Sequence, residues 1–229
     1  MQTGALDMTV LPLAYEGGKI PETNLGLMPA LVTSYEQGLR WKTAPIGKAL
    51  SDVVEGKGVK IITWVWQAGG VASKSKSIVQ PADAKDVKIR GGSKEMDMML
   101  KGAGGSITNV PSSEIYNAMQ TGVLDAAVTS STSLLSFRLY EVAKQVTTAR
   151  KNTFWFMFEP LLMAKSTYNS LTPAQQKIVT EVGAELEKFA MEESKKDDVR
   201  LGEVYSKNGA TASDMDDAGF AKGRELAKK

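Results

Sequence analysis

The heptapeptide MQTGVLD at residues 119–125 repeats MQTGALD at residues 1–7 with a single substitution. Ahead of the second copy, apolar residues spaced i, i+3 and i+4 predict one face of a helix. Gly122 stands where a helix commonly ends in a left-handed residue, and the apolar run at 123–128 predicts a short buried strand. The repeated unit is therefore a helix, a glycine stop and a strand, and its recurrence predicts two similar α/β lobes.

The first copy has the same glycine and the same strand but almost no helix before them. Residues 1–3 would form only the last turn of a helix, and one isolated turn is not stable in water. We therefore expect the chain to begin inside an element whose earlier part lies upstream of residue 1. The alternative is a chance match at a frayed coil.

The rest of the chain continues this mixture of short strands and helices. Apolar runs, capping residues and glycines predict a strand over 58–66, a short strand over 86–92, a helix over 93–105, a strand over 106–110, a helix over 134–144 and a β-rich run over 153–166 that bends at its proline. Thr172 and Gln175 form a capping box, and the apolar spacing after them predicts a helix to residue 206, long enough to brace both lobes. The polar tail 208–229 predicts a short peripheral helix.

Composition excludes several classes of function. With 28 basic and 26 acidic residues, the formal charge of +2 supplies no global field for nucleic acid. The sequence has no cysteine and no histidine, which excludes disulfides, thiolate nucleophiles, serine–histidine catalysis and histidine zinc sites. We therefore expect no metal, no cofactor and no nucleic-acid partner. No apolar run approaches the ~20 residues that span a bilayer.

One long stretch carries the motifs of a known family. The run PADAKDVKIRGGSKEMDMMLKGAGGSITNVPSSEIYNAMQTGVLDAAV at 81–128 resembles the second lobe of substrate-binding proteins of tripartite ATP-independent periplasmic (TRAP) transporters. The positions that match the family pattern are Pro81, Asp83, Lys85, Lys88, Ile89, Arg90, Pro111, Glu114, Tyr116, Ala118, Gln120, Gly122 and Asp125. The phrase SLTPAQQKIV at 170–179 resembles the start of the family's long C-terminal helix, and MQTGALDMTV resembles its first-lobe segment.

The resemblance implies a two-lobed α/β fold of the type II periplasmic-binding-protein kind, with the ligand cleft between the lobes. On this basis lobe I comprises 1–66 and 156–195, and lobe II comprises 67–155 and 196–229. It also implies an extracytoplasmic protein of the periplasm that captures a small organic acid and delivers it to the membrane permease subunits of the transporter. The opening part of lobe I and an export signal would then precede residue 1.

Arg90 is the strongest candidate for contact with such an acid. It ends a predicted strand and is followed by two glycines and a helix start, and ligands bind at the carboxyl ends of strands in open α/β sheets. An arginine holds a carboxylate with two parallel hydrogen bonds. The family's carboxylate-binding arginine also falls at this position. The alternative is a surface ion pair with a nearby acid.

Three hydroxyl residues are secondary candidates for ligand contact. Ser93 is placed either to donate to the ligand or only to cap the following helix. Thr129 falls where the family places a polar residue, and its hydroxyl suits the same carboxylate. Ser112 falls where the family has an aromatic residue, so it either opens space or caps a helix. The family's second basic residue has no arginine equivalent here, which leaves Lys74 or Lys76, or a ligand with fewer charged contacts.

Aromatic residues at predicted strand ends complete the candidate site. Tyr15 follows the first strand, Trp66 ends the strand that crosses between the lobes, and Trp155 and Phe156 begin the second interlobe run. Plain core packing is the alternative for all four. An aromatic-rich pocket with one arginine would suit a monocarboxylate with an apolar body, but dicarboxylates and sugar acids stay open.

Two other classes of function compete with a binding protein. The effector domain of a regulator can share this two-lobed fold, but it works with a helix-turn-helix and none is visible in these residues. An enzyme would depend on carboxylates, lysine or an oxygen-bound metal. Glu114 and Asp125 form no convincing acid/base pair, because each suits a structural role near a helix end or a turn. We therefore predict a binding protein without catalysis.

Overall fold

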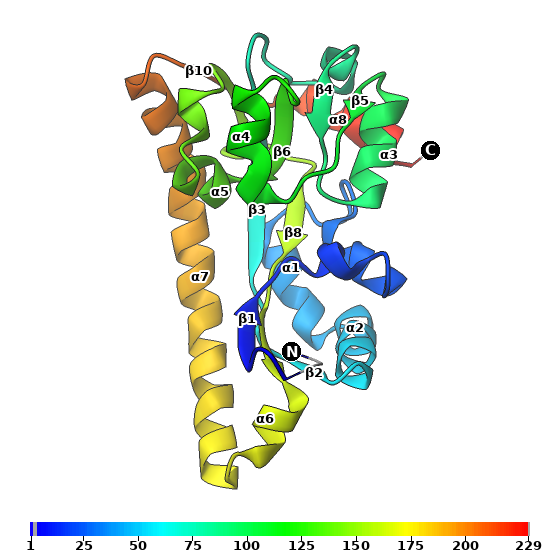
Figure 1. The fold of residues 1–229 in the computed structure, drawn as a ribbon, viewed down its shortest axis with the longest axis vertical. Helices are drawn as coiled ribbons and strands as arrows, with labels where there is room; N and C mark the ends of the chain where they lie inside the picture. The colour runs from blue at the N-terminus through cyan, green and yellow to red at the C-terminus, as the bar shows by residue number, and fades with distance from the viewer. Residues whose placement is uncertain (2–3, 229) are drawn as a thin grey trace.

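The structure is a computed structural model that describes residues 1 and 4–228. The chain forms two α/β lobes, one above the other, with helix α7 (Pro173–Lys207) running beside both (Figure 1). The predicted two-lobed α/β fold is confirmed. The helical turn predicted at 1–3 falls mostly on residues outside the described part. Gly4, which follows it, has a left-handed φ of +77°.

The smaller lobe is built on a three-stranded antiparallel sheet. Its strands lie in the order β1 (Met8–Val10), β9 (Leu161–Ala164) and β2 (Val59–Thr63). Around the sheet lie the short 3-10 helices η1 (Leu13–Glu16), η2 (Pro21–Leu27) and η3 (Trp41–Thr43) and the helices α1 (Tyr35–Arg40), α2 (Pro45–Gly56) and α6 (Lys165–Ser170). One apolar cluster holds this lobe together, and three tryptophans, Trp41, Trp64 and Trp66, are buried in it.

The larger lobe is built on a seven-stranded mixed sheet. Six strands lie in the order β10 (Thr211–Asp214), β7 (Gln145–Thr148), β3 (Trp66–Ser73), β6 (Ala126–Ser130), β4 (Lys88–Arg90) and β5 (Ser106–Ile107), and β8 (Phe156–Phe158) pairs with β3. The helices of this lobe are α3 (Lys94–Gly102), α4 (Ile115–Gln120), α5 (Ser131–Ser136) and α8 (Asp217–Ala227), with the 3-10 helices η4 (Pro81–Ala84), η5 (Ser112–Glu114) and η6 (Leu139–Glu141). Strands β6, β4 and β5 run parallel, so their carboxyl ends meet at one edge.

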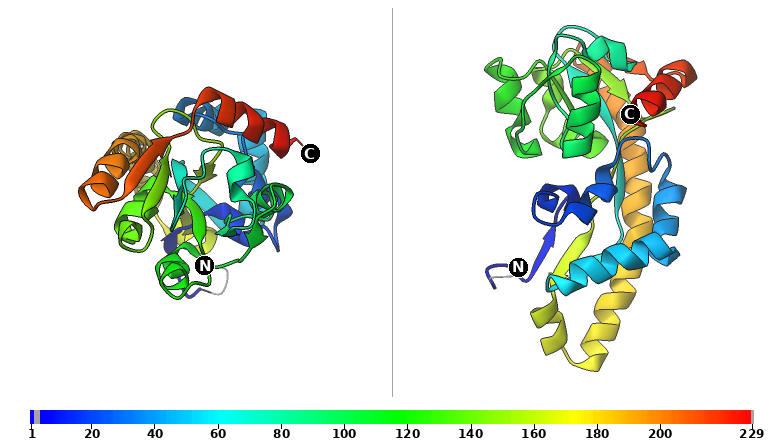
Figure 2. Two further views of the ribbon diagram at one scale, coloured as in Figure 1. Left: turned by 90° about the horizontal axis from the view of Figure 1, so that it is seen from above. Right: turned by 90° about the vertical axis from the view of Figure 1, so that its right-hand side faces the viewer.

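Strands β3 and β8 and helix α7 run from one lobe to the other (Figure 1; Figure 2 gives two further views). Strands β3 and β8 pair antiparallel, with Trp66 opposite Phe158. The capping box at the start of α7 is confirmed, because the Thr172 hydroxyl accepts from the Gln175 N–H and the Gln175 side chain accepts from the Thr172 N–H. The predicted lobe boundaries after residues 66 and 155 fall where β3 and β8 begin, and that division stays a prediction.

Three predicted elements differ from the structure. The strand predicted over 58–66 is two strands, and the second continues through Gly69 and Gly70, which look like a loop in sequence. A Cβ at Gly69 would lie 2.2 Å from the Trp155 ring and one at Gly70 would lie 2.0 Å from the Thr147 carbonyl, so these glycines admit close packing inside a strand. The tail contributes a strand, β10, ahead of its predicted helix.

The third difference is the helix predicted over 134–144. Helix α5 begins earlier, because the Ser130 hydroxyl accepts from the Ser133 N–H as its N-cap. It ends before Arg138, whose left-handed φ of +54° breaks the helix. The 3-10 helix η6 follows within the predicted span, and β7 begins just after it, at Gln145.

Glu159 at the bend between β8 and β9 makes stability depend on pH. Burial raises the pKa of its carboxyl to about 7, from an ordinary value of 4.5. The folded state then binds this proton more tightly than the unfolded state, so stability falls as pH rises from about 4.5 to 7 and is level above that. Glu159→Gln removes this penalty, so relative to the unmodified protein we expect its free energy of unfolding to gain about 3 kcal/mol between pH 4 and pH 8. Urea denaturation at pH 4 and pH 8 measures the free energy of unfolding of both proteins. If that free energy changes between the two pH values by the same amount in both, the prediction is wrong.

Candidate functional site

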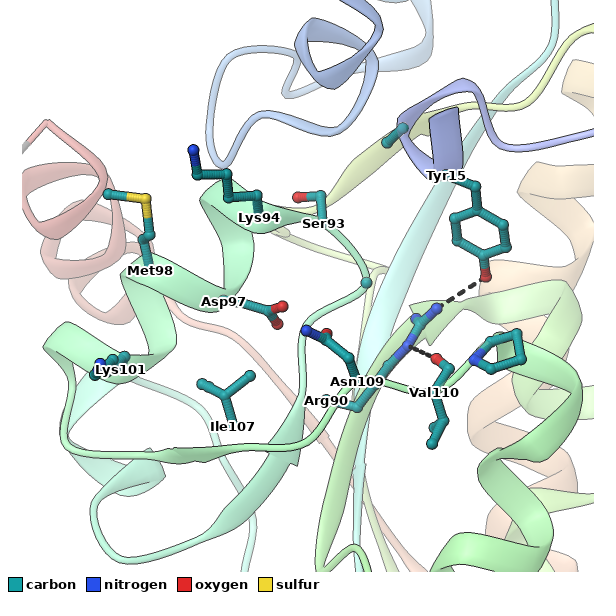
Figure 3. A pocket seen from close by; sticks show the side chains of 13 residues that line it. Tyr15, Arg90, Ser93, Lys94, Asp97, Met98, Lys101, Ile107, Asn109 and Val110 are labelled. Atoms are coloured by element: carbon teal, nitrogen blue, oxygen red, sulfur yellow. Dashed lines mark hydrogen bonds between the residues drawn. The ribbon is translucent and has the colours of Figure 1, made fainter. Parts of the chain in front are cut away.

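Arg90 ends β4 with a side chain that is only 2% exposed. Its Nε donates to the Val110 carbonyl at 3.0 Å and its Nη2 to the Tyr15 hydroxyl at 2.8 Å (Figure 3). Its Nη1 donates to the Val128 carbonyl at 2.9 Å. These contacts use three of the five N–H bonds that a guanidinium carries. None of the ion pairs in the described part of the chain involves this residue, and the oxygens that accept its hydrogen bonds are neutral.

The two glycines after Arg90 make this placement possible. Gly92 has a left-handed φ of +94°, and a Cβ there would lie 2.6 Å from Arg90 Nη1. A larger residue would therefore be strained and would also displace the guanidinium. The Gly91 N–H donates to Asp97 Oδ1 at 3.0 Å, which fixes the turn that leads into α3.

A cavity of about 680 Å³ opens beside the guanidinium. One wall comes from Ala14 and Tyr15 of η1, and the other from α3 and the segment 107–111. Arg90, Tyr15 and Ser93, three of the residues predicted for the site, line this one cavity. The structure thus brings residues far apart in sequence to a single concave surface.

The cavity also holds charged groups that the sequence argument did not select. Lys94, Asp97 and Lys101 line it from α3, and Asn109 lines it from the opposite segment. Burial raises the pKa of Asp97, against the hydrogen bonds that it accepts from Gly91 and Asn109 and against the Arg90 charge. The three α3 residues are spaced i, i+3 and i+7, opposite the buried methionine face of the helix. That polar stripe was the available sequence signal.

Tyr15 links η1 to the larger lobe. Its hydroxyl oxygen accepts from Arg90 Nη2 and from the backbone N–H of Ser112, at 2.8 and 3.2 Å. With two donors directed at the oxygen, the hydroxyl hydrogen is the part left to point toward a ligand. Ser112 thus reaches the site through its backbone, and it makes no side-chain cap for the helix after it.

Ser93 lines the cavity, whereas Thr129 and Trp155 do not. The Ser93 hydroxyl caps α3 by accepting from the Met96 N–H and donates to the Leu27 carbonyl at 3.3 Å. Thr129 follows Val128 in β6 and is buried. The Trp155 ring packs on Gly69, the neighbour of Thr129's strand partner Gly70, and its indole N–H is buried without a partner among the described residues.

Trp66 and Phe156 do not line this cavity. Trp66 begins β3 instead of ending a strand, and its ring packs against Trp41 and Phe158 with centroids 5.1 Å apart in each pair. Phe156 packs edge-on against Tyr35 at 5.1 Å. Both rings belong to the core of the smaller lobe, which matches the packing alternative.

The two lysines considered as a second basic contact point elsewhere. Lys74 Nζ donates to the Met119 carbonyl at 3.0 Å, and Lys76 Nζ donates to the Lys85 carbonyl at 3.3 Å. Neither lines the cavity. The basic side chains near Arg90 are those of α3 instead.

Comparison with known proteins assigns the chain to a family. Residues 1–228 match the DctP family of bacterial extracellular solute-binding proteins, family 7. The chain belongs to this family, as the resemblance to TRAP substrate-binding proteins predicted. No helix in the described part is both long and apolar enough to cross a membrane.

Two curated relatives extend along most or all of the chain. A solute-binding protein of Albidiferax ferrireducens is 55% identical over 229 residues, which is 100% of this chain and 68% of the relative. A solute-binding protein of a Sulfitobacter species is 27% identical over 220 residues, which is 93% of this chain and 64% of the relative. The chain thus spans 68% and 64% of the length of these two proteins.

Two solved structures share the fold. A TRAP periplasmic solute-binding protein from Rhodoferax ferrireducens, with bound malonate, matches with a TM-score of 0.98 and 55% identity over 99% of this chain and 72% of its own. A TRAP periplasmic solute-binding protein from Sulfitobacter, with bound β-D-galacturonate, matches with a TM-score of 0.88 and 25% identity over 99% of this chain and 74% of its own. Both relatives were captured with an organic acid.

The Tyr15 hydroxyl is expected to stabilise the contact between η1 and the larger lobe. Tyr15→Phe removes the acceptor for a charged donor and for a backbone N–H, so we expect a loss of about 1–3 kcal/mol in the free energy of unfolding. Chemical denaturation measures it. Tyr168→Phe is the control, because its hydroxyl meets only Thr180 on an exposed surface. Equal losses in the two variants would argue against the Tyr15 contact.

Proposed function

We propose that this chain captures a small organic acid in the cavity beside Arg90, as the binding component of a TRAP-type transporter. The observation that carries the proposal is a buried guanidinium with no carboxylate partner among the described residues. Burying a charge without a counter-charge is unfavourable. A ligand carboxylate would supply the missing charge and accept the N–H bonds that the protein does not use.

Each contact around Arg90 suits that role. The carbonyls of Val110 and Val128 orient the guanidinium without neutralising its charge. The two N–H bonds that the protein does not use remain for a paired contact with a carboxylate. We propose Arg90 as the anion anchor and Tyr15 as a second donor on the opposing wall. Ser93 and Ser112 would shape the site more than bind the acid, since their polar atoms serve α3, Leu27 and Tyr15.

Thr129 and Trp155 are the proposed contacts for the rest of the acid. Thr129 directly follows Val128, whose carbonyl accepts from Arg90, and the Trp155 ring packs on Gly69 of the neighbouring strand β3. The unpartnered Trp155 N–H is a donor that a ligand oxygen could satisfy. Asp97 on the cavity wall would disfavour a second carboxylate close to it and favour a ligand hydroxyl or amine. Lys94 and Lys101, on either side of Asp97 in that stripe, would favour a second negative group, so the class of acid depends on how it lies in the cavity.

The relatives support the same ligand chemistry. Malonate and β-D-galacturonate, the acids in the two solved relatives, each carry a carboxylate. We further propose that this protein works in the periplasm and hands its ligand to the membrane permease subunits of the transporter, because its family is extracellular and solute-binding. Closure of the two lobes around the ligand would be the step that the partner recognises.

A thermal-shift screen tests this proposal directly. Malonate, pyroglutamate, D-glucuronate and β-D-galacturonate are added one at a time at increasing concentration. A bound acid is expected to stabilise the protein by ~2.7 kcal/mol at one hundred times its Kd, because it binds only the folded state. Arg90→Met is expected to abolish the shift, because it removes the anchoring charge.

The matched control is Arg200→Met, which removes an exposed arginine on α7. It is expected to respond to the same acid as the unmodified protein does. The proposal is wrong if no acid in the screen raises the melting temperature, or if Arg90→Met and Arg200→Met respond alike.

A further inference from the structure

A second buried polar cluster lies at the junction of the lobes, apart from the cavity. Its centre is Asp198 near the middle of α7, which is 6% exposed. One carboxylate oxygen accepts from the Tyr35 hydroxyl at 2.7 Å, and the other accepts from the Ser131 hydroxyl at 2.5 Å. Tyr35 opens α1 of the smaller lobe and Ser131 opens α5 of the larger lobe. One carboxylate therefore holds a residue of each lobe.

Tyr35 contacts α7, β3 and β8, which all run between the lobes. Its hydroxyl donates to α7 and accepts from the Ala68 N–H of β3 at 3.2 Å. Its ring packs edge-on against Phe156 of β8, with centroids 5.1 Å apart. Next to Asp198, the Asp197 carboxylate accepts from the Thr132 hydroxyl at 2.8 Å, which ties α7 to α5 a second time.

The chemistry of the cluster ties it to one arrangement of the lobes. A buried carboxylate is costly unless hydrogen bonds satisfy it, and bonds to a charged acceptor are stronger than neutral ones. Here the two donors come from different lobes. A rotation of one lobe against the other would lengthen one of these bonds or pull Tyr35 off the β3 backbone, so the cluster is satisfied only near the orientation seen here.

That orientation is also the one in which Tyr15 contacts Arg90. We infer that Tyr35 and Asp198 are positioning residues for ligand capture: they hold the lobes in the closed arrangement and so raise affinity without touching the ligand. The inference rests on the proposed function, since closure matters for affinity only if a ligand binds between the lobes. None of Tyr35, Ser131 and Asp198 lines the cavity.

The test measures the distance between the lobes and the affinity separately. The sequence has no cysteine, so Ala49→Cys on α2 and Gln120→Cys on α4, both exposed positions, place one spin label on each lobe. In this background, Tyr35→Phe removes a single hydroxyl. We expect the interlobe distance distribution of the ligand-free protein to broaden and move to longer distances. We also expect the Kd for malonate to rise about tenfold, through loss of one strong hydrogen bond.

The matched control is Tyr205→Phe, the same substitution on α7. Tyr205 is fully buried, and its hydroxyl has no hydrogen-bond partner in the described part of the chain. We expect this variant to leave both the distance distribution and the Kd unchanged. A purely structural role for Tyr35 predicts that both variants leave the distances unchanged, and that result would overturn the inference.

A second variant covers the case in which Tyr35→Phe does not fold. Ser131→Ala removes the donor from the other lobe and should shift the distances in the same direction, and unchanged distances would again overturn the inference. Failure of the proposed function looks different, because the unmodified protein would then bind no acid while the distance shifts still appeared. The ligand-free distances therefore decide the role of the cluster by themselves.

Discussion

Much of this architecture depends on burying the Arg90 guanidinium with neutral oxygens as its hydrogen-bond acceptors. The Val110 and Val128 carbonyls belong to segments that follow and neighbour β4, and the Tyr15 hydroxyl comes from the far side of the cavity. The parallel strands must therefore end at one edge, and η1 must reach across to that edge. Gly92 leaves room for the side chain. These features together keep a positive charge ready for an anion.

The molecule has a second buried charge, which differs from Arg90 in its sign and in how its hydrogen bonds are satisfied. Asp198 is a carboxylate without a basic partner in the described part of the chain, yet two hydroxyls satisfy both of its oxygens. Arg90 keeps unused donors beside a cavity, whereas Asp198 sits in packed protein. Unused hydrogen-bond donors beside a cavity favour a ligand site, whereas a carboxylate whose oxygens both accept hydrogen bonds favours a contact that holds the lobes together. Each charge draws a tyrosine hydroxyl toward it, so the two clusters act on the same relative placement of the lobes.

Local chemistry accounts for what could be predicted from the sequence. The capping box at Thr172, the N-cap at Ser93 and the left-handed Gly122 depend on neighbours within a few residues, and the structure has all three. Gly69 and Gly70 could not be placed, because the need for glycine there comes from Trp155 and Thr147, which are far away in the chain. Local pattern cannot distinguish a glycine that permits a turn from one that admits a distant ring.

The predictions for the candidate site likewise divide into those that local pattern supports and those that depend on distant contacts. Strand-end position and residue type were enough to select Arg90, because parallel strands place their carboxyl ends together. Tyr15 was selected as an aromatic residue after the first strand, and it lies in η1. These criteria were not enough to separate Trp155, which packs in the core of the larger lobe, from Trp66 and Phe156, which pack in the core of the smaller lobe. Periodicity specifies which residues an element contains and how it begins and ends. Long-range packing between the lobes decides which side chains share a cavity and which charges stay unpaired, because those contacts join residues that no local rule relates.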